Sequence, residues 1–159
     1  MNLNNSFEQS VAEHPAEIAL HYAGGDVPYK KLHEAVRRLA GGLSELGVMQ
    51  GDRVAVCLPN IPHFPIAYYA TLRLGAVVVP VNTMNKGREA SWLLEDSEAQ
   101  VLIIWAELLK EMSRHILILP SLKHIVVLGD TDYPKAINMT HMISRSKPMS
   151  DIADMEEND

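Results

Sequence analysis

The stretch from Gly51 to Asn82 constrains the fold more than any other part of this chain. Two short apolar runs, Arg53–Leu58 and Ala76–Val81, are rich in β-branched residues and too short for buried helices, so each is predicted to be a strand covered on both faces. Between them, apolar side chains recur at helical spacing, and Gly75 stands where a helix ends in a residue of positive φ. The connection suits a crossover helix and is too long for a hairpin. The stretch is therefore predicted to be a βαβ unit with a right-handed connection.

The same alternation continues along the chain. Val101–Trp105 and His124–Leu128 are predicted to be further strands, and Gly87–Ser97 and Glu107–His115 to be helices. Strands that alternate with helices at regular intervals predict an α/β fold, a doubly wound parallel sheet with helices on both faces. Because the sequences of these units do not repeat, a solenoid is excluded.

Two elements precede this sheet. Ser6 to Glu13 is predicted to form a short helix with Ser6 as its N-cap. Two strand-like runs then flank the pair Gly24-Gly25, which indicates a hairpin. Pro28 cannot donate a ladder hydrogen bond, so this N-terminal hairpin is expected to lie at an edge.

The clearest helix is predicted over Lys30 to Leu46, which carries one apolar stripe. Glu34 and Arg38 are spaced for an ion pair on its surface. Gly41-Gly42 should cost the helix about 1 kcal/mol per glycine, and we expect a close approach to the sheet to offset this. The basic residues are expected to form a solvated helix face: Lys30, Lys31, Arg37 and Arg38.

Composition limits the class of protein. The 159 residues, 47% of them hydrophobic, suffice for one domain with a sizeable core. A formal charge of −6 argues against a nucleic-acid binder. The single cysteine suits a reducing compartment, no signal peptide is visible, and no apolar run reaches the length of a transmembrane span. The prediction is a soluble cytoplasmic protein.

The character of the chain changes near Thr131. Prolines, methionines and serines surround a short stretch, Ile137–Ile143, and five acidic residues lie among the last nine. Such a composition is typical of a solvated tail or linker. We therefore predict an N-terminal α/β subdomain over residues 1–130 and a partly ordered linker and acidic tail over residues 131–159, leading towards a further region.

Three polar residues follow the predicted strands. Crevices of doubly wound sheets form beyond the carboxyl ends of the strands, where Asn60, His63 and Asn82 stand. All three are candidates to line a crevice. The plainer interpretation makes Asn60 a helix N-cap, Asn82 a turn former and His63 a surface histidine.

Other signals of chemistry are weak. No phosphate-binding glycine loop or nucleophile elbow is present, and the histidines show no metal-ligand spacing, so no metal site is predicted. Cys57 lies in mid-strand and is expected to be a small buried hydrophobe. Trp92 and Trp105 follow helix and strand periodicity and are expected to pack in the core.

Four segments, in order, resemble a known family. Val27–Leu32 resembles the (T/S)YxEL motif of the adenylate-forming acyl-CoA synthetases, and Leu72–Asn82 (LRLGAVVVPVN) resembles their LKAGAxxxPLN motif. Gly51–Asn60 matches their GDRVAxxLPN strand, and Glu95–Ile103 their "L-x-D-S-x-A-K-V-L-I" run. The overall sequence pattern is similar to that of fatty acid–CoA ligases. Lys31, Arg73-Leu74 and Pro65 depart from the family pattern, and Pro65 is expected to delay regular helical hydrogen bonding until near Ala67.

The resemblance implies the N-terminal part of an AMP-forming ligase that activates a fatty acid as acyl-adenylate and transfers it to CoA. It implies ATP, CoA and Mg²⁺ for the parent enzyme. In the family the phosphate loop, YTSGTTGxPKG, follows an acidic linker like Ser150–Asp159, and this chain ends before it. No catalytic residue can be assigned, and we expect the fragment alone to be inactive and to hold no cofactor.

Two other hypotheses stay open. The chain could be a non-catalytic interaction module, for instance one that forms a homodimer through exposed apolar surface. A free-standing flavodoxin-like binding domain is a weaker alternative, because the sequence supplies no glycine- or hydroxyl-rich loop at a strand end.

Overall fold

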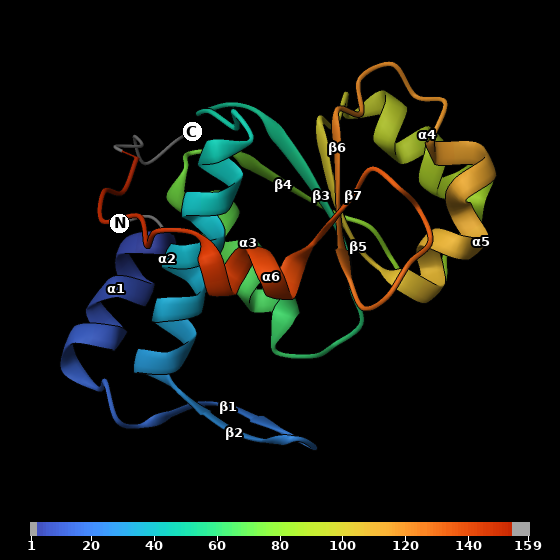
Figure 1. Ribbon diagram of the computed structural model, residues 1–159. Helices are drawn as coiled ribbons and strands as arrows, with labels where there is room; N and C mark the ends of the chain where they lie inside the picture. The colour runs from blue at the N-terminus through green and yellow to red at the C-terminus, as the bar shows by residue number, and fades with distance from the viewer. Residues whose placement is uncertain (1–2, 154–159) are drawn as a thin grey trace.

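A parallel sheet of five strands forms the centre of the protein, as the computed structural model shows for residues 3–153 (Figure 1). The strand order is β4-β3-β5-β6-β7, and β1 and β2 pair separately as an antiparallel hairpin. In chain order the elements are α1 (Leu3–Glu13), β1 (Ile18–Tyr22), β2 (Gly25–Pro28), α2 (Tyr29–Glu45), β3 (Arg53–Cys57), α3 (His63–Arg73), β4 (Val77–Pro80), α4 (Gly87–Asp96), β5 (Val101–Trp105), α5 (Ala106–Ile116), β6 (His124–Leu128), β7 (Ala136–Asn138) and α6 (Met139–Arg145).

The predicted βαβ unit is confirmed. Strands β3 and β4 run parallel, with Arg53 opposite Val77, and helix α3 connects them. Gly75 has the expected positive φ, 68°. On its other side β3 pairs with β5, so the chain crosses from one side of β3 to the other, which is the arrangement of a doubly wound sheet.

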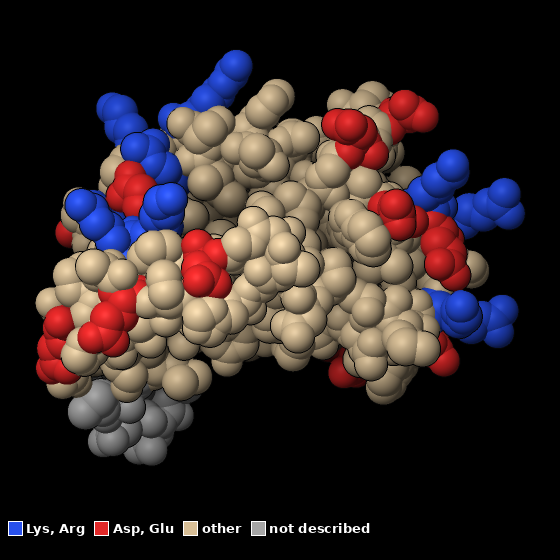
Figure 2. All heavy atoms as spheres, turned by 90° about the horizontal axis from the view of Figure 1, so that it is seen from below, with Lys and Arg blue, Asp and Glu red and all other residues tan. Residues whose placement is uncertain are grey.

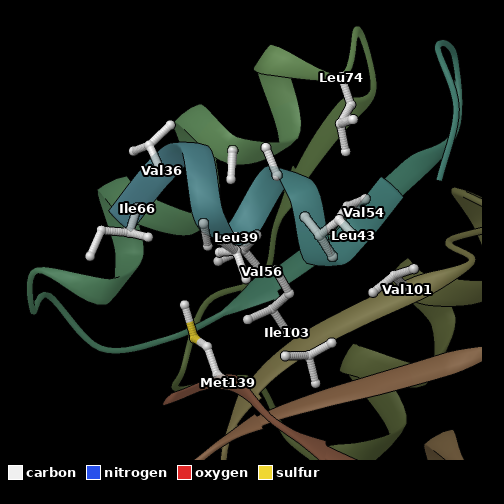
Figure 3. Close-up of a cluster of buried hydrophobic side chains, with 14 of the residues drawn as sticks. Val36, Leu39, Leu43, Val54, Val56, Ile66, Leu74, Val101, Ile103 and Met139 are labelled. Carbon is white, nitrogen blue, oxygen red and sulfur yellow. The ribbon is translucent and has the colours of Figure 1, made fainter. Parts of the chain in front are cut away.

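Helices cover the sheet on both faces. Helices α1, α2, α3 and α6 lie on one side and α4 and α5 on the other (Figure 1). Side chains of β3 alternate between the two layers: Val54 and Val56 meet the first, Ala55 and Cys57 the second. Figure 3 shows the first core, in which the apolar stripe of α2 packs on the sheet, as the sequence predicts.

Strand β4 lies at the edge of the sheet. Both of its faces are partly covered, because Val78 packs against the first core and Val79 against the second, but it pairs only with β3 among residues 3–153. Val77 is accordingly 49% exposed. An unbroken apolar run describes a central strand and this edge strand equally well, because the run carries no information on how many neighbours the strand has.

The segment predicted as a solvated linker contains two elements. Strand β7 extends the parallel sheet beside β6, and α6 packs against α2 with Met139 and Met142 buried. The expectation of a solvated tail is therefore wrong for residues 136–145, which form a strand and a helix too short to show a clear hydrophobic period. Most of the acidic residues fall in 154–159, outside the described residues. The division of a longer protein near residue 130 stays a prediction.

Corrections at the N-terminus are small. Helix α1 includes residues from Leu3, so Ser6 lies inside it and is not its N-cap. Helix α3 begins at His63, and backbone bonding of α-helical spacing starts with the N–H of Ile66, which donates to the carbonyl of Pro62 at 3.3 Å, close to the expected Ala67. Pro65 occupies the first turn, where a missing N–H breaks no helical hydrogen bond. The hairpin is confirmed, with Gly25 at φ 122°. None of the helices among residues 3–153 is long and apolar enough to cross a membrane.

The glycine pair of α2 marks a close approach, but not to the sheet. A Cβ on Gly41 would lie 2.0 Å from the carbonyl oxygen of Lys147, and one on Gly42 would lie 2.3 Å from Cγ of Met142. The helix therefore approaches α6 and the chain that follows it. The expected solvated basic face is also wrong at Arg37 and Arg38, whose guanidinium groups donate to backbone carbonyls of that same region.

Candidate functional site

Asn60, a candidate to line a crevice beyond the sheet, lies next to a cavity. This residue follows β3 and is exposed, and it lines a cavity of about 370 Å³ between the β3–α3 connection and the N-terminal hairpin. The proposed N-cap role of Asn60 is wrong, because α3 starts after Pro62 and has no side-chain cap. The lining residues are Leu20, His21, Tyr22, Ala23, Asn60, Ile61, Pro62 and Pro65.

His63 lies beside this cavity in sequence but does not line it. It is half-buried at the start of α3, and its Nδ1 is buried without a hydrogen-bond partner among the described residues. Burial lowers the pKa of His63 below its ordinary value, because the charged imidazolium is poorly solvated there. The ring is therefore neutral at pH 7 and adds no positive charge to the crevice.

Asn82 forms a turn. It follows β4, is exposed, and its Oδ1 accepts the backbone N–H of Met84 at 2.9 Å. The plainer interpretation from the sequence is confirmed, since an asparagine that bonds two residues ahead closes an Asx turn. The structure thus does not gather Asn60, His63 and Asn82 in one described cavity.

A larger cavity was not predicted from the sequence. A space of about 470 Å³ lies between α5 and the loop after β6, with Lys110 and Ser113 on the helix and Asp130, Thr131 and Asp132 on the loop. The sequence hint for this cavity is the Gly129-Asp130 pair directly after a predicted strand. This hint is not specific, because such pairs occur in many ordinary turns. Two carboxylates and one ammonium group make this cavity a poor match for a triphosphate.

Trp92 corrects another expectation. It was predicted to pack in the core but is 63% exposed on α4. It borders a shallow hollow with Arg88 and Leu93. Trp105 is partly buried against the first core, as predicted.

Reactive groups are sparse in the described part of the chain. Cys57 is fully buried in β3, and burial raises the pKa of its thiol to about 11, so it is inert at neutral pH. Residues 3–153 contain no group of three or more His, Cys, Asp or Glu side chains that could hold a metal ion. Lys86, a cation near the carboxyl end of β4, faces Glu111 at 3.6 Å. These residues do not fit the phosphates of ATP or a Mg²⁺ ion.

Surface charge argues against a nucleic-acid binder. On the face shown in Figure 2, Lys and Arg gather towards the two ends of the molecule with Asp or Glu beside them, while the middle is mostly uncharged. No continuous basic stripe crosses this face, and a phosphate-backbone binder needs one.

The fold defines the chain as a doubly wound α/β domain with a crevice beyond β3. Comparison with known proteins adds the family. The model of the AMP-binding enzyme family matches residues 7–158, and the chain belongs to this family.

Two curated relatives illustrate the range of the family. A long-chain-fatty-acid–CoA ligase of Escherichia coli O6:H1 is 38% identical over 104 residues, which covers 65% of this chain and 18% of the relative. A crotonobetaine/carnitine–CoA ligase of Salmonella paratyphi B is 32% identical over 124 residues, 77% of this chain and 24% of the relative. The chain thus spans about a quarter or less of these relatives.

Solved structures share the fold. A benzoate CoA ligase from Burkholderia xenovorans LB400 superposes with a TM-score of 0.89 at 22% identity, covering 100% of this chain and 31% of that one. At this identity the likeness shows the fold alone. The predicted resemblance to CoA ligases is confirmed at the level of the family.

Proposed function

We propose that this chain is the N-terminal part of an ATP-dependent, AMP-forming fatty acid–CoA ligase. The parent enzyme would condense a fatty acid with ATP to an acyl-adenylate and pyrophosphate, and then transfer the acyl group to CoA. The observation that carries the choice of substrate is the 38% identity to the long-chain-fatty-acid–CoA ligase. The crotonobetaine/carnitine–CoA ligases, at 32–35% identity, suggest the alternative substrate.

The role proposed for this part is structural. Phosphoryl chemistry needs cationic and backbone donors around the phosphates, and residues 3–153 do not supply such a set. We propose that these groups, with the sites for ATP, CoA and Mg²⁺, belong to the rest of the longer protein. Asn60, which lines the crevice, is the residue of this chain that we propose to face the substrates.

The test compares two proteins. The full-length gene product is assayed for ATP–pyrophosphate exchange with palmitate, with crotonobetaine and with benzoate, and the 159-residue chain is assayed in parallel. We expect exchange by the full-length product with palmitate and none by the chain alone. ATP–pyrophosphate exchange with crotonobetaine only would refute the proposal that the substrate is a fatty acid. Exchange catalysed by the 159-residue chain would refute the proposal that this chain alone is inactive.

A second candidate function has one observation in its favour. Trp92 is 63% exposed and lines a shallow hollow with Leu93, which is apolar surface of the kind found at interfaces. We infer from this surface an interaction module that self-associates. Sedimentation of the chain at increasing concentration tests this: mass that rises with concentration in the native chain but not in Trp92→Ser supports self-association, and a constant monomer mass refutes it.

A further inference from the structure

The chain after α6 is tied down over two helices. Residues 147–153, here called the strap, follow α6 and run past α1 and α2 (Figure 1). The N–H of Met149 donates to the carbonyl of Arg37 on α2 at 2.9 Å, and the N–H of Ala153 donates to the carbonyl of Arg73 on α3 at 2.9 Å. Met149 and Ala153 are therefore anchored to different helices, α2 and α3.

Two arginine side chains hold the middle of the strap. Nε of Arg37 and Nε of Arg73 both donate to the carbonyl oxygen of Met149, at 3.0 and 3.2 Å. Nη2 of Arg73 donates to the carbonyl oxygen of Ser150 at 2.8 Å, and Nη2 of Arg37 donates to its hydroxyl oxygen at 3.3 Å. The rigid fork of a guanidinium group makes such paired contacts, which a lysine cannot reproduce.

Arg73 is itself fixed from the opposite side. Its side chain is 2% exposed, and its Nη1 pairs with the carboxylate of Glu8 on α1. The same carboxylate meets Nε2 of His33 on α2 at 3.0 Å. A buried guanidinium group is tolerated only when it is paired and its donors are used. Arg73 meets this condition by joining α1, α3 and the strap.

Two glycines leave room for the strap. Gly41 lets the carbonyl oxygen of Lys147 approach to 2.0 Å from where a Cβ would stand, and a Cβ on Gly75 would lie 3.0 Å from that of Ala153. Gly75 directly precedes Ala76 and β4. The strap therefore brings the chain to the beginning of the edge strand of the sheet.

We infer that Arg73 is a positioning residue of the ligase: with Arg37 it fixes the path by which the chain passes from this domain to the phosphate-binding region. This inference rests on the proposed function. The resemblance places the phosphate loop after an acidic linker like Ser150–Asp159, so the strap sets the point from which that segment starts. Arg73 acts through the backbone of the strap and touches no substrate.

The first test measures amide hydrogen exchange in the 159-residue chain. Arg73→Lys keeps the charge but loses the fork, and we expect the amides of Met149 and Ala153 to exchange about tenfold faster or more, while Val56 in the core is unchanged. Arg53→Lys is the matched control, since Arg53 also donates to a backbone carbonyl and pairs with a glutamate, but away from the strap.

Two further variants keep the test decisive if Arg73→Lys does not fold. Arg37→Lys removes the second fork, and Gly41→Ala displaces Lys147 without touching either arginine. Each variant should also speed up hydrogen exchange at the amides of Met149 and Ala153. Unchanged exchange of Met149 and Ala153 in the variants that fold, or an equal acceleration in Arg53→Lys, would overturn the inference.

The second test uses the full-length ligase. We expect Arg73→Lys to raise the KM for ATP about fivefold or more, because a misplaced phosphate-binding segment loses contacts, and to leave the KM for the carboxylate within about twofold. A general packing defect would change both constants together and would refute the positioning role. If the wild-type protein shows no ligase activity, the proposed function fails, and the exchange test still decides on the strap.

Discussion

At the scale of single residues, removing the charge of Glu8 should lower the stability of the fold strongly, although glutamine has almost the same size and shape as glutamate. Its carboxylate balances the buried guanidinium group of Arg73 and meets His33. Glu8→Gln leaves that positive charge without a counter-charge, and breaking a buried pair in this way costs about 3 kcal/mol of unfolding free energy. Urea denaturation measures the loss.

The matched control for this prediction is Glu98→Gln. Glu98 also pairs with an arginine, Arg53, at 2.9 Å, but its side chain is 75% exposed. Exposed pairs contribute about 0–1 kcal/mol. Equal losses in the two variants would mean that the burial of Arg73 does not matter for stability.

Cys57 should make stability depend on pH in the alkaline range. Burial raises the pKa of its thiol from 9.0 to about 11, so the folded chain keeps the proton that the unfolded chain loses. The contribution is fully present below pH 9 and falls as pH rises towards 11, by about 2–3 kcal/mol in total. Comparison with Cys57→Ala isolates this contribution, because the two chains share every other ionisable group. Parallel curves would contradict the prediction.

At the scale of elements, α6 should belong to the cooperative fold although its sequence has the composition of a linker. Met139 at its start is fully buried against the core of α2 and the sheet (Figure 3). Met139→Ala should destabilise the chain by about 2–5 kcal/mol through lost contacts and a cavity. The control Met84→Ala removes an 81% exposed side chain and should change stability by at most about 0.5 kcal/mol. A similar small effect at both positions would place α6 outside the fold.

The sequence predicts long elements well and short ones poorly. The central βαβ unit and the stripe of α2 follow from periodicity, which several turns or a whole strand express. Residues 136–145 form a three-residue strand and a seven-residue helix, too short for a period to emerge. Trp92 shows the same limit on a helix, because its spacing fits the apolar stripe while its side chain points to solvent.

Of the candidate site, the placement of Asn60 beyond the carboxyl end of β3 follows from the order of strands, and its role towards the substrates stays a prediction. Asn60 comes directly after β3, and the rule for doubly wound sheets needs no side-chain detail. The strap contacts could not be predicted, because Arg37, Arg73 and Met149 lie far apart in the sequence and meet only once three helices are packed. Gly41 indicated that another segment comes close to α2, but the sequence did not indicate that this segment is the backbone at Lys147.

At the scale of the whole molecule, the sheet joins the two cores into one cooperative unit. Leu39 packs in the core under α2 and Leu94 in the core under α4, and alternate residues of β3 and β5 contribute to both. A strand that loses its support on one face cannot keep its contacts on the other. We therefore expect damage to either core to lower the stability of both.

Trp105 can report on this coupling, because it packs against the core of α2 while Leu94 belongs to the opposite one. In a Trp92→Phe background, Leu94→Ala should lower the free energy of unfolding by about 2–5 kcal/mol. The urea midpoints followed by Trp105 fluorescence and by far-ultraviolet circular dichroism should fall together. Leu39→Ala, in the core that Trp105 contacts, is the positive control. If Leu94→Ala shifts the dichroism midpoint but leaves Trp105 unmoved, the two faces unfold separately and the sheet does not couple them.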